Sequence, residues 1–266
     1  MQIGHREAVT ADSISTPTQD DFKECYRGRQ SALHHAAYMR MAKVLLALHL
    51  CEKAGIGLDG KDIFDYGFGA GTFYRYCPPG SHLFGVEMDA ENVGAVRAML
   101  LDRGFANADL QTIEIERWQE HPLLARTYDF VLCSHVLEHL PDPVGFLRKM
   151  SDCLGPSSAF MGLVPINERQ MDPHHVQTVN RAKIEEWARE SGLRVAHYLE
   201  GDPLMYWVQP VFADNKGLMR GLAQVISLGL GIPATLLGPR WWPQVGKLGA
   251  LLTRSLPTQA AFILTR

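Results

Sequence analysis

Apolar residues recur at two spacings along this chain, and the change between them divides it into segments. In residues 22–54 they recur every three or four positions, which places them on one face of a helix. Beyond Gly55, short apolar runs alternate with helical segments. Strands separated by helices pair in parallel, because a parallel crossover needs a dozen or more residues. The pattern therefore predicts a doubly wound α/β sheet.

The segments have these boundaries. The predicted strands are residues 62–66, 82–87, 110–115, 128–133, 159–164, 193–199 and 259–264, and helices are predicted at 90–103, 144–154 and 181–191. We expect five units: a flexible lead-in (1–21), an N-terminal helical segment (22–60), the α/β core (61–200), a helical cap or insertion (201–257) and a final core strand (258–266).

Composition narrows the class of protein without identifying it. The chain has 266 residues, of which 46% are hydrophobic and 21% charged, as in soluble globular proteins. A net charge of −3 gives no reason to expect nucleic-acid binding. Five cysteines without a CxxC pair indicate reduced thiols, and the polar N-terminus lacks the apolar core of a signal peptide. We therefore expect a cytoplasmic location.

A glycine-rich turn follows the first predicted strand. Gly67, Gly69 and Gly71 lie between this strand and the next helical segment, and glycine lets the backbone approach a ligand closely. Glu87 ends the second strand, sixteen positions after Gly71, where a carboxylate can accept both hydroxyls of a ribose. Together the turn and the acid indicate a cofactor that contains adenosine, either a dinucleotide or S-adenosylmethionine.

Two motifs carry a resemblance to a known family. The loop reads GxGxG after Asp65, whereas a dinucleotide loop reads GxGxxG. Residues 128–143 form a strand and a turn that ends in Glu-His-Leu-Pro-Asp-Pro. Over residues 62–199 the chain resembles the small-molecule branch of the class I S-adenosylmethionine-dependent methyltransferases. The resemblance implies a Rossmann-like sheet of seven strands with N-terminal helices and a helical cap.

The resemblance also implies roles for individual residues. Asp65 and the backbone of Gly67 and Gly69 would hold the methionine end of the cofactor, Glu87 the ribose and Met88 the adenine. Further expected cofactor contacts are Phe68, Gly71, Glu116, Trp118, Cys133, Ser134, Tyr26 and Arg29. Of these, Glu116 and Trp118 would border adenine, and Ser134 would lie beside the sulfonium with His135. Tyr26 and Arg29 would contact the cofactor carboxylate or form a solvated face.

Histidines and acids cluster after the fourth and fifth predicted strands. The candidate catalytic residues are His135, Glu138, His139 and His174, with Asp172 and His175 nearby in the sequence. Neighbouring parallel strands open on the same ligand crevice, so these side chains are expected to converge. Three interpretations remain open. His135 or His174 is a general base for a substrate hydroxyl, the cluster binds a metal, or Glu138 and His139 only stabilise the turn.

The metal interpretation follows from the same resemblance. Ubiquinone-pathway O-methyltransferases and small-RNA 2′-O-methyltransferases carry Glu-x-x-Glu-His followed later by a histidine. The implied ligands here are His135, Glu138, His139 and His174, although His135 stands where those families have the first Glu. A divalent metal at this position would lower the pKa of a bound hydroxyl and orient it.

The predicted activity is methylation of a small molecule at a hydroxyl oxygen. The alternatives are N- or C-methylation of a natural product or sugar, and a non-catalytic methyltransferase-like binding protein. Nucleic acid is not the expected acceptor, because no Asn/Asp-Pro-Pro-Tyr motif follows the fourth strand.

Residues 217–249 form an unusually apolar insertion. Arg220, Gln224 and Pro233 interrupt it, which argues against a bilayer span of ~20 apolar residues. We expect helices that cover the substrate cleft or form a homodimer interface. A segment on a membrane surface, reaching a lipid-like substrate, is the alternative.

Overall fold

The computed structural model describes residues 35, 37–105, 107–168, 174–202 and 217–266. Within these ranges the chain forms a seven-stranded sheet with the order β3-β2-β1-β4-β5-β7-β6. The strands are β1 (Asp62–Tyr66), β2 (His82–Glu87), β3 (Asp109–Thr112), β4 (Tyr128–Ser134), β5 (Leu154–Pro165), β6 (Arg194–Gly201) and β7 (Gln259–Thr265). The sheet confirms the predicted Rossmann-like class.

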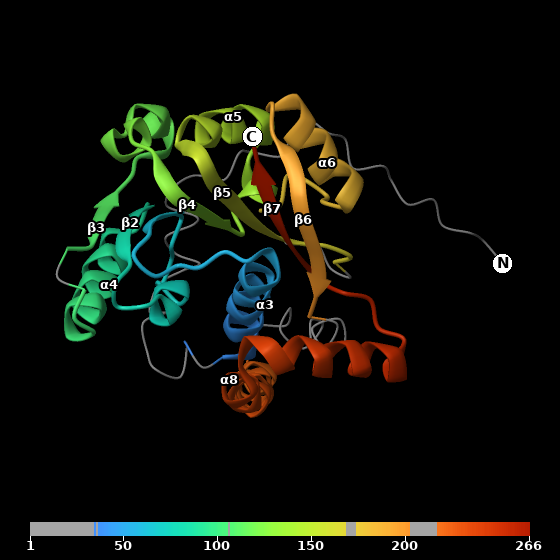
Figure 1. The fold of residues 1–266 in the computed structure, drawn as a ribbon. Coiled ribbons are helices and arrows are strands. Elements are labelled where there is room, and N and C mark those ends of the chain that lie inside the picture. Colours follow the sequence, from blue (N-terminus) through green and yellow to red (C-terminus); the bar gives the residue numbers. More distant parts are fainter. Residues whose placement is uncertain (1–34, 36, 106, 169–173, 203–216) are drawn as a thin grey trace, which may run out of the picture.

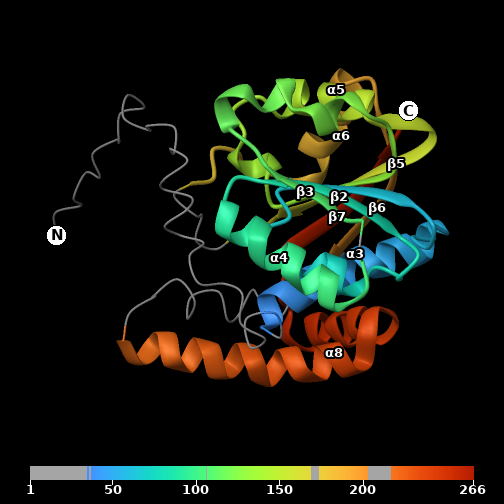
Figure 2. The ribbon, with the colours of Figure 1, turned by 90° about the vertical axis from the view of Figure 1, so that its left-hand side faces the viewer.

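Helices cover both faces of the sheet, as Figures 1 and 2 show. The α-helices are α3 (Tyr38–Ala54), α4 (Ala90–Asp102), α5 (Pro143–Asp152), α6 (Arg181–Glu190) and α8 (Gly217–Thr253). The 3-10 helices are η2 (Phe73–Tyr76), η3 (Ile115–Glu120), η4 (Pro122–Ala125) and η5 (Leu137–His139). Helices α5 and α6 lie on one face and α3 and α4 on the other, with α8 as an outer layer beneath α3. Each face buries its own apolar core.

The last strand departs from the predicted parallel pairing. Strands β1 to β5 pair in parallel, but β7 runs antiparallel to both β5 and β6. The N–H of Thr258 donates to the carbonyl of Gly201 at 3.1 Å, so β7 begins beside the end of β6. The insertion between these strands returns the chain to the edge it left, and the next strand must therefore run backwards.

Three predicted elements differ in extent. Strand β5 begins at Leu154, five positions before the predicted start at residue 159. The third strand ends at Thr112, not at residue 115, and residues 115–120 form the 3-10 helix η3. The first predicted helix, residues 22–54, corresponds in the described part of the chain to α3, which begins at Tyr38. Its residues 22–34 lie outside the described residues, as does the lead-in 1–21.

Helix α8 packs mainly against α3. The backbone N–H of Tyr38 donates to Ser227 Oγ at 2.9 Å, and the rings of Tyr38 and Trp242 form a T-shaped pair with centroids 5.5 Å apart. The helix is bent at Gly238, whose φ of 69° interrupts the helical backbone. No helix in the described ranges is both long and apolar enough to cross a membrane.

Candidate functional site

The glycine turn after β1 requires glycine for its backbone shape. Gly67, Gly69 and Gly71 have φ values of 75°, 54° and 66°, in the left-handed region where other residues are strained. The N–H of Gly67 donates to the carbonyl of Val86 at 2.9 Å, which joins the turn to β2. The turn therefore lies at the carboxyl end of β1, and its contact with a cofactor stays a prediction.

The same glycines also permit close packing. A Cβ at Gly67 would lie 2.9 Å from the side chain of Val136, and one at Gly71 would lie 2.6 Å from Val96. Val136 belongs to the turn that follows β4, and Val96 belongs to α4. The glycine turn and the histidine turn after β4 are therefore in direct contact.

Glu87 closes over the glycine turn. Its carboxylate accepts hydrogen bonds from the N–H of Gly69 at 2.7 Å and of Met88 at 2.9 Å. Burial raises the pKa of Glu87, and these hydrogen bonds oppose the rise. The carboxylate lies where the sequence predicts a ribose partner; its role in binding the cofactor stays a prediction.

Asp65 is a buried carboxyl group with an unmet hydrogen-bonding atom. It is 3% exposed, and its Oδ1 has no hydrogen-bond partner among the described residues. Burial and the nearby carboxylate of Glu87 raise the pKa of Asp65 well above its ordinary value. A cationic ligand group would pair with the unpartnered oxygen and would stabilise the charged carboxylate. This position therefore fits the ammonium of a methionine moiety.

The other predicted cofactor residues have mixed surroundings. Phe68 is buried against Tyr74, Met88 and Ser134 are half-buried, and the side chain of Cys133 is completely buried. Glu116 is exposed on η3. Their contacts with a cofactor stay predictions.

Trp118 packs against aromatic residues of the core. Its ring lies 6.0 Å from that of Tyr66 and 5.3 Å from that of Phe146, measured between centroids. The predicted border of adenine is therefore also part of the packing on the α5 face.

His35, three positions before α3 begins, makes one contact that sequence reasoning missed. Tyr26 and Arg29 lie outside the described residues, but His35 Nδ1 lies 3.1 Å from Thr72 Oγ1, directly after the glycine turn. Burial, with Arg75 and Arg40 nearby, lowers the pKa of His35 to about 4. The imidazole is therefore neutral near pH 7. No local pattern pointed to this pair, because the partners are far apart in the sequence.

The histidine turn begins with a strained residue. His135 follows β4 with a φ of 57°, a conformation uncommon for a residue other than glycine. Its Nδ1 lies 3.1 Å from Glu138 Oε1, and its Nε2 lies 2.7 Å from Gln259 Oε1 on β7. Both ring nitrogens thus have partners, and Gln259 is a site residue that the sequence did not suggest.

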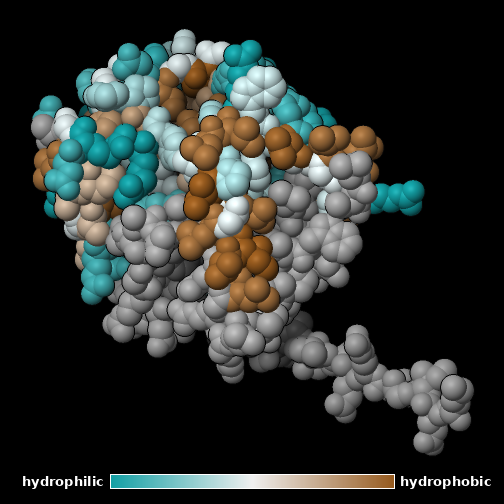
Figure 3. All heavy atoms as spheres, turned by 90° about the horizontal axis from the view of Figure 1, so that it is seen from below, coloured by the Kyte–Doolittle hydropathy of each residue, from teal (hydrophilic) through white to brown (hydrophobic). Residues whose placement is uncertain are grey.

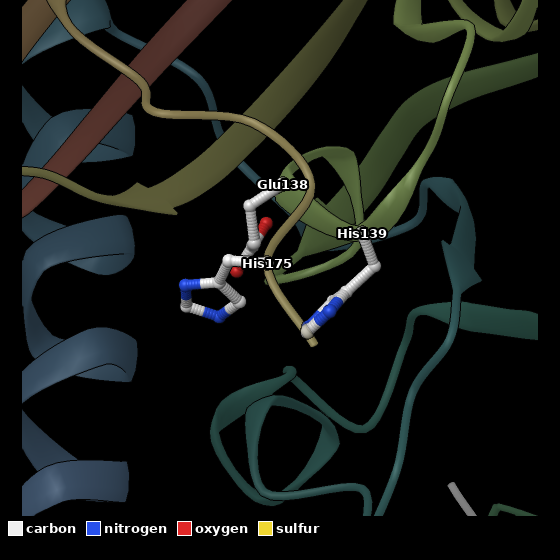
Figure 4. Close-up of side chains that lie close together, drawn as sticks. All are labelled: Glu138, His139 and His175. Atoms are coloured by element: carbon white, nitrogen blue, oxygen red, sulfur yellow. The ribbon is translucent and has the colours of Figure 1, made fainter. Parts of the chain in front are cut away.

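Glu138 lies at the centre of the second site. It is 0% exposed, and neither carboxylate oxygen has a well-aligned hydrogen bond among the described residues. Burial would raise the pKa of Glu138, but His135 and His139 outweigh it and hold the pKa below its ordinary value. Figure 4 shows its side chain close to His139 and His175. One ligand atom from each of the three residues lies within 4.8 Å of the others.

Hydrogen bonds orient the two histidines of this group. His139 Nδ1 lies 3.0 Å from the carbonyl oxygen of His174, and His175 Nδ1 lies 2.9 Å from Glu168 Oε2. Each Nδ1–H therefore donates, which makes Nε2 the basic nitrogen of both rings. Histidines that bind metals are oriented in this way by an acceptor behind the ring. Two imidazoles and one carboxylate are a donor set that suits a divalent transition metal.

This arrangement changes the predicted ligand set. Glu138 and His139 come together as expected, but the third member of the group is His175, and neither His135 nor His174 belongs to it. His174 supplies its backbone carbonyl to His139 instead. Adjacent residues of an irregular loop can point in different directions, so the sequence could not distinguish the two. Asp172 lies outside the described residues.

Comparison with known proteins assigns the chain to a family. Residues 33–198 match the model of a methyltransferase domain. The ubiquinone biosynthesis O-methyltransferase of Sodalis glossinidius is 32% identical over 130 residues, 48% of each chain. The corresponding protein of Aeromonas salmonicida is 32% identical over 108 residues, 40% of this chain and 44% of the relative. The chain thus spans about half the length of these curated relatives.

Solved structures show the same fold at low sequence identity. A putative sarcosine dimethylglycine methyltransferase from Galdieria sulphuraria has a TM-score of 0.60 at 16% identity, and covers 92% of this chain and 96% of its own. The cyclase SpnF has a TM-score of 0.64 at 14% identity, and the match covers 94% of this chain and 97% of SpnF. One fold thus supports different reactions, and the acceptor has to be argued from the site.

Proposed function

Because the chain belongs to the methyltransferase-domain family of class I S-adenosylmethionine-dependent enzymes, we propose that it methylates a hydroxyl oxygen of a small molecule. One observation carries the choice of a hydroxyl. The completely buried carboxylate of Glu138 groups with His139 and His175 beside the glycine turn. The names of the curated relatives, which are O-methyltransferases, agree with it.

The cofactor would lie across the carboxyl ends of β1 and β2. The proposed partner of its ammonium group is Asp65, whose Oδ1 lacks a hydrogen bond among the described residues. Glu87 would exchange one of its bonds to backbone N–H groups for the ribose hydroxyls. The bound cofactor supplies an activated methyl group on a sulfonium. The chain has to align the acceptor with that methyl group, and alignment can lower a barrier by ~7–11 kcal/mol.

A hydroxyl group needs help to lose its proton near neutral pH. We propose that Glu138 Oε and the Nε2 atoms of His139 and His175 hold a divalent cation. Such a cation, when bound, lowers the pKa of an adjacent hydroxyl and orients it. Glu138 supplies negative charge, and Glu168 and the carbonyl of His174 keep both imidazoles in the required tautomer. His135, held between Glu138 and Gln259, would position the carboxylate.

Metal analysis of the full chain, purified without a histidine tag, tests this proposal. After chelation, the protein is titrated with Mn²⁺, Mg²⁺ or Zn²⁺, and methyl transfer from labelled S-adenosylmethionine is measured with simple phenols, amines and thiols. We expect transfer to a phenol that depends on one of these cations. Removing a metal ligand should lower activity at least as much as removing a supporting group, which costs about 10–100-fold.

His175→Ala and His174→Ala are a matched pair for this test. The first removes a proposed ligand, while the second preserves the backbone carbonyl that orients His139. We expect loss of cation binding in His175→Ala alone. Transfer that persists in His175→Ala without any cation would leave a histidine base as the explanation. Methylation of amines but not of phenols would overturn the hydroxyl acceptor.

A further inference from the structure

The outer face of α8 exposes an apolar surface. Several of its large apolar side chains face solvent, including Leu236 at 82%, Leu251 at 77% and Trp241 at 62% exposure. Figure 3, which views the molecule from the side of α8, shows hydrophobic residues gathered in a band. Burying apolar surface is favourable, so a face of this kind indicates contact with a partner or a membrane.

The opposite face of α8 is already occupied. Ser227 and Ala234 are seven positions apart and buried, as is Trp242 beyond the bend, and these residues face α3. The hydrogen bond between Tyr38 and Ser227 and the ring contact between Tyr38 and Trp242 fix this orientation. The exposed residues therefore cannot turn inward without breaking the packing of α3, and α8 must present them outward.

Positive charge accompanies this apolar face. Arg240 and Lys247 are exposed and seven positions apart, and each directly precedes an exposed apolar residue, Trp241 or Leu248. Residues seven apart lie on one side of a helix, so the two cations border the apolar band. Residues 217–266 contain no Asp or Glu. The surface is thus apolar and cationic, although the whole chain has a net charge of −3.

We propose that α8 rests on an anionic lipid surface, with its apolar side chains among the acyl chains and its cations at the headgroups. A helix in the membrane interface combines these two features, and Trp is favoured at that depth. Arg and Lys at the border can extend their charges to lipid phosphates. The inference rests on other residues than the proposed reaction and does not depend on it.

The charge of this face favours an anionic lipid surface over a second copy of the chain as its partner. A symmetric dimer through the same face would bring Arg240 and Lys247 of both copies into one interface. The absence of acidic residues in 217–266 leaves that segment no carboxylate to compensate them. Anionic headgroups supply the missing negative charge, and each cation near such a surface strengthens binding by about fivefold.

Vesicle co-sedimentation of the full chain tests the proposal. The probes are phosphatidylcholine vesicles with or without about one third phosphatidylglycerol. We expect binding to the anionic vesicles, weaker binding to phosphatidylcholine alone, and a loss of binding in about 0.5 M salt. The double variant Leu236→Gln/Leu251→Gln should bind at least about tenfold more weakly. Arg240→Gln/Lys247→Gln should reduce binding to anionic vesicles alone.

Matched variants lie on other surfaces. Leu101→Gln/Ile115→Gln changes exposed apolar residues outside α8, and Lys183→Gln/Arg189→Gln changes exposed cations of α6. These should bind vesicles like the unmodified chain, and thermal unfolding checks that every variant is folded. The proposal would be overturned if the α8 variants bound anionic vesicles as strongly as the unmodified chain. It would also be overturned if the unmodified chain did not bind anionic vesicles. A dimer in sedimentation velocity that Leu236→Gln/Leu251→Gln dissociates would assign the face to a second copy instead.

Discussion

Two buried acidic sites lie side by side at the carboxyl edge of the sheet, and their surroundings differ. Glu87 accepts hydrogen bonds from backbone N–H groups, whereas Asp65 lies near Glu87 and its Oδ1 has no partner among the described residues. Burial raises the pKa of both carboxyl groups. Glu138 faces His135 and His139, which hold its pKa below the ordinary value in spite of burial. The glycine turn joins the two sites through the contact between Gly67 and Val136.

The difference indicates what each site lacks. A pair of buried carboxyl groups without a cation is costly to ionise, and a ligand with a positive charge removes that cost. A carboxylate already flanked by oriented imidazoles has the composition of a metal site. The site of Asp65 and Glu87 thus fits a cationic cofactor, and the site of Glu138 fits a metal. Variants of each site can test the two assignments separately.

Removal of the charge of Glu138 should have the largest effect. Glu138→Gln keeps the size of the side chain but takes away the charged ligand. We expect the affinity for a divalent cation to fall by at least about 100-fold, while S-adenosylmethionine binds as before. Isothermal titration of each ligand measures both. If cation affinity were unchanged, Glu138 would be structural, and the contrast between the sites would not hold.

Removal of the charge of Asp65 should act on the other site alone. Asp65→Asn should weaken S-adenosylmethionine by about 10–100-fold, the range expected for a hydrogen bond to a charged group. Asp62→Asn, on the same strand but part-exposed, is the matched control and should bind normally. Cation affinity should be the same in both variants. Normal cofactor binding by Asp65→Asn would contradict the assignment of Asp65 to the ammonium.

The carboxylate behind His175 should matter less than the ligands themselves. Glu168→Gln leaves an acceptor oxygen near Nδ1 but removes its charge. We expect cation affinity to fall by about tenfold, at the lower end for such supporting groups. A fall as large as that of Glu138→Gln would mean that Glu168 itself is a ligand.

The pH dependence of cofactor binding should be the smallest effect. Without cofactor, Asp65 has a raised pKa and tends to hold a proton. A bound ammonium favours the carboxylate form of Asp65, so binding of the cofactor releases a proton. The affinity for the cofactor should therefore rise a few-fold with pH, until the pH exceeds the pKa of Asp65. Titrations in buffers of different protonation enthalpy measure the proton release, and Asp65→Asn should reduce it. Affinity that falls as pH rises would reverse the sign and refute the linkage.

Local patterns were sufficient for the parallel part of the fold. The alternation of apolar runs and helices predicted β1, β2 and β4 closely and residues 159–164 of β5, because each buried strand must be apolar and each crossover needs a helix. The direction of β7 could not be predicted in this way. It depends on where α8 returns the chain, which is set by packing against α3 and not by the composition of residues 259–264.

The two acidic sites differ in how far the sequence could describe them. The glycine turn and Glu87 form through contacts within about twenty residues, so motif spacing located them. The histidine site takes Glu138 and His139 from one turn, and His175 and Glu168 from a loop after β5. Spacing indicated that these segments converge but could not choose between His174 and His175.

By itself the sequence determined the class of fold, the glycine turn with its acidic partner, and the apolar, cationic composition of α8. These properties follow from backbone conformation and burial over short stretches of chain. Tertiary structure decided which histidine joins Glu138, that Gln259 holds His135, and which face of α8 remains outside. Such outcomes depend on side chains that meet across distant segments, and only packing in three dimensions brings them together.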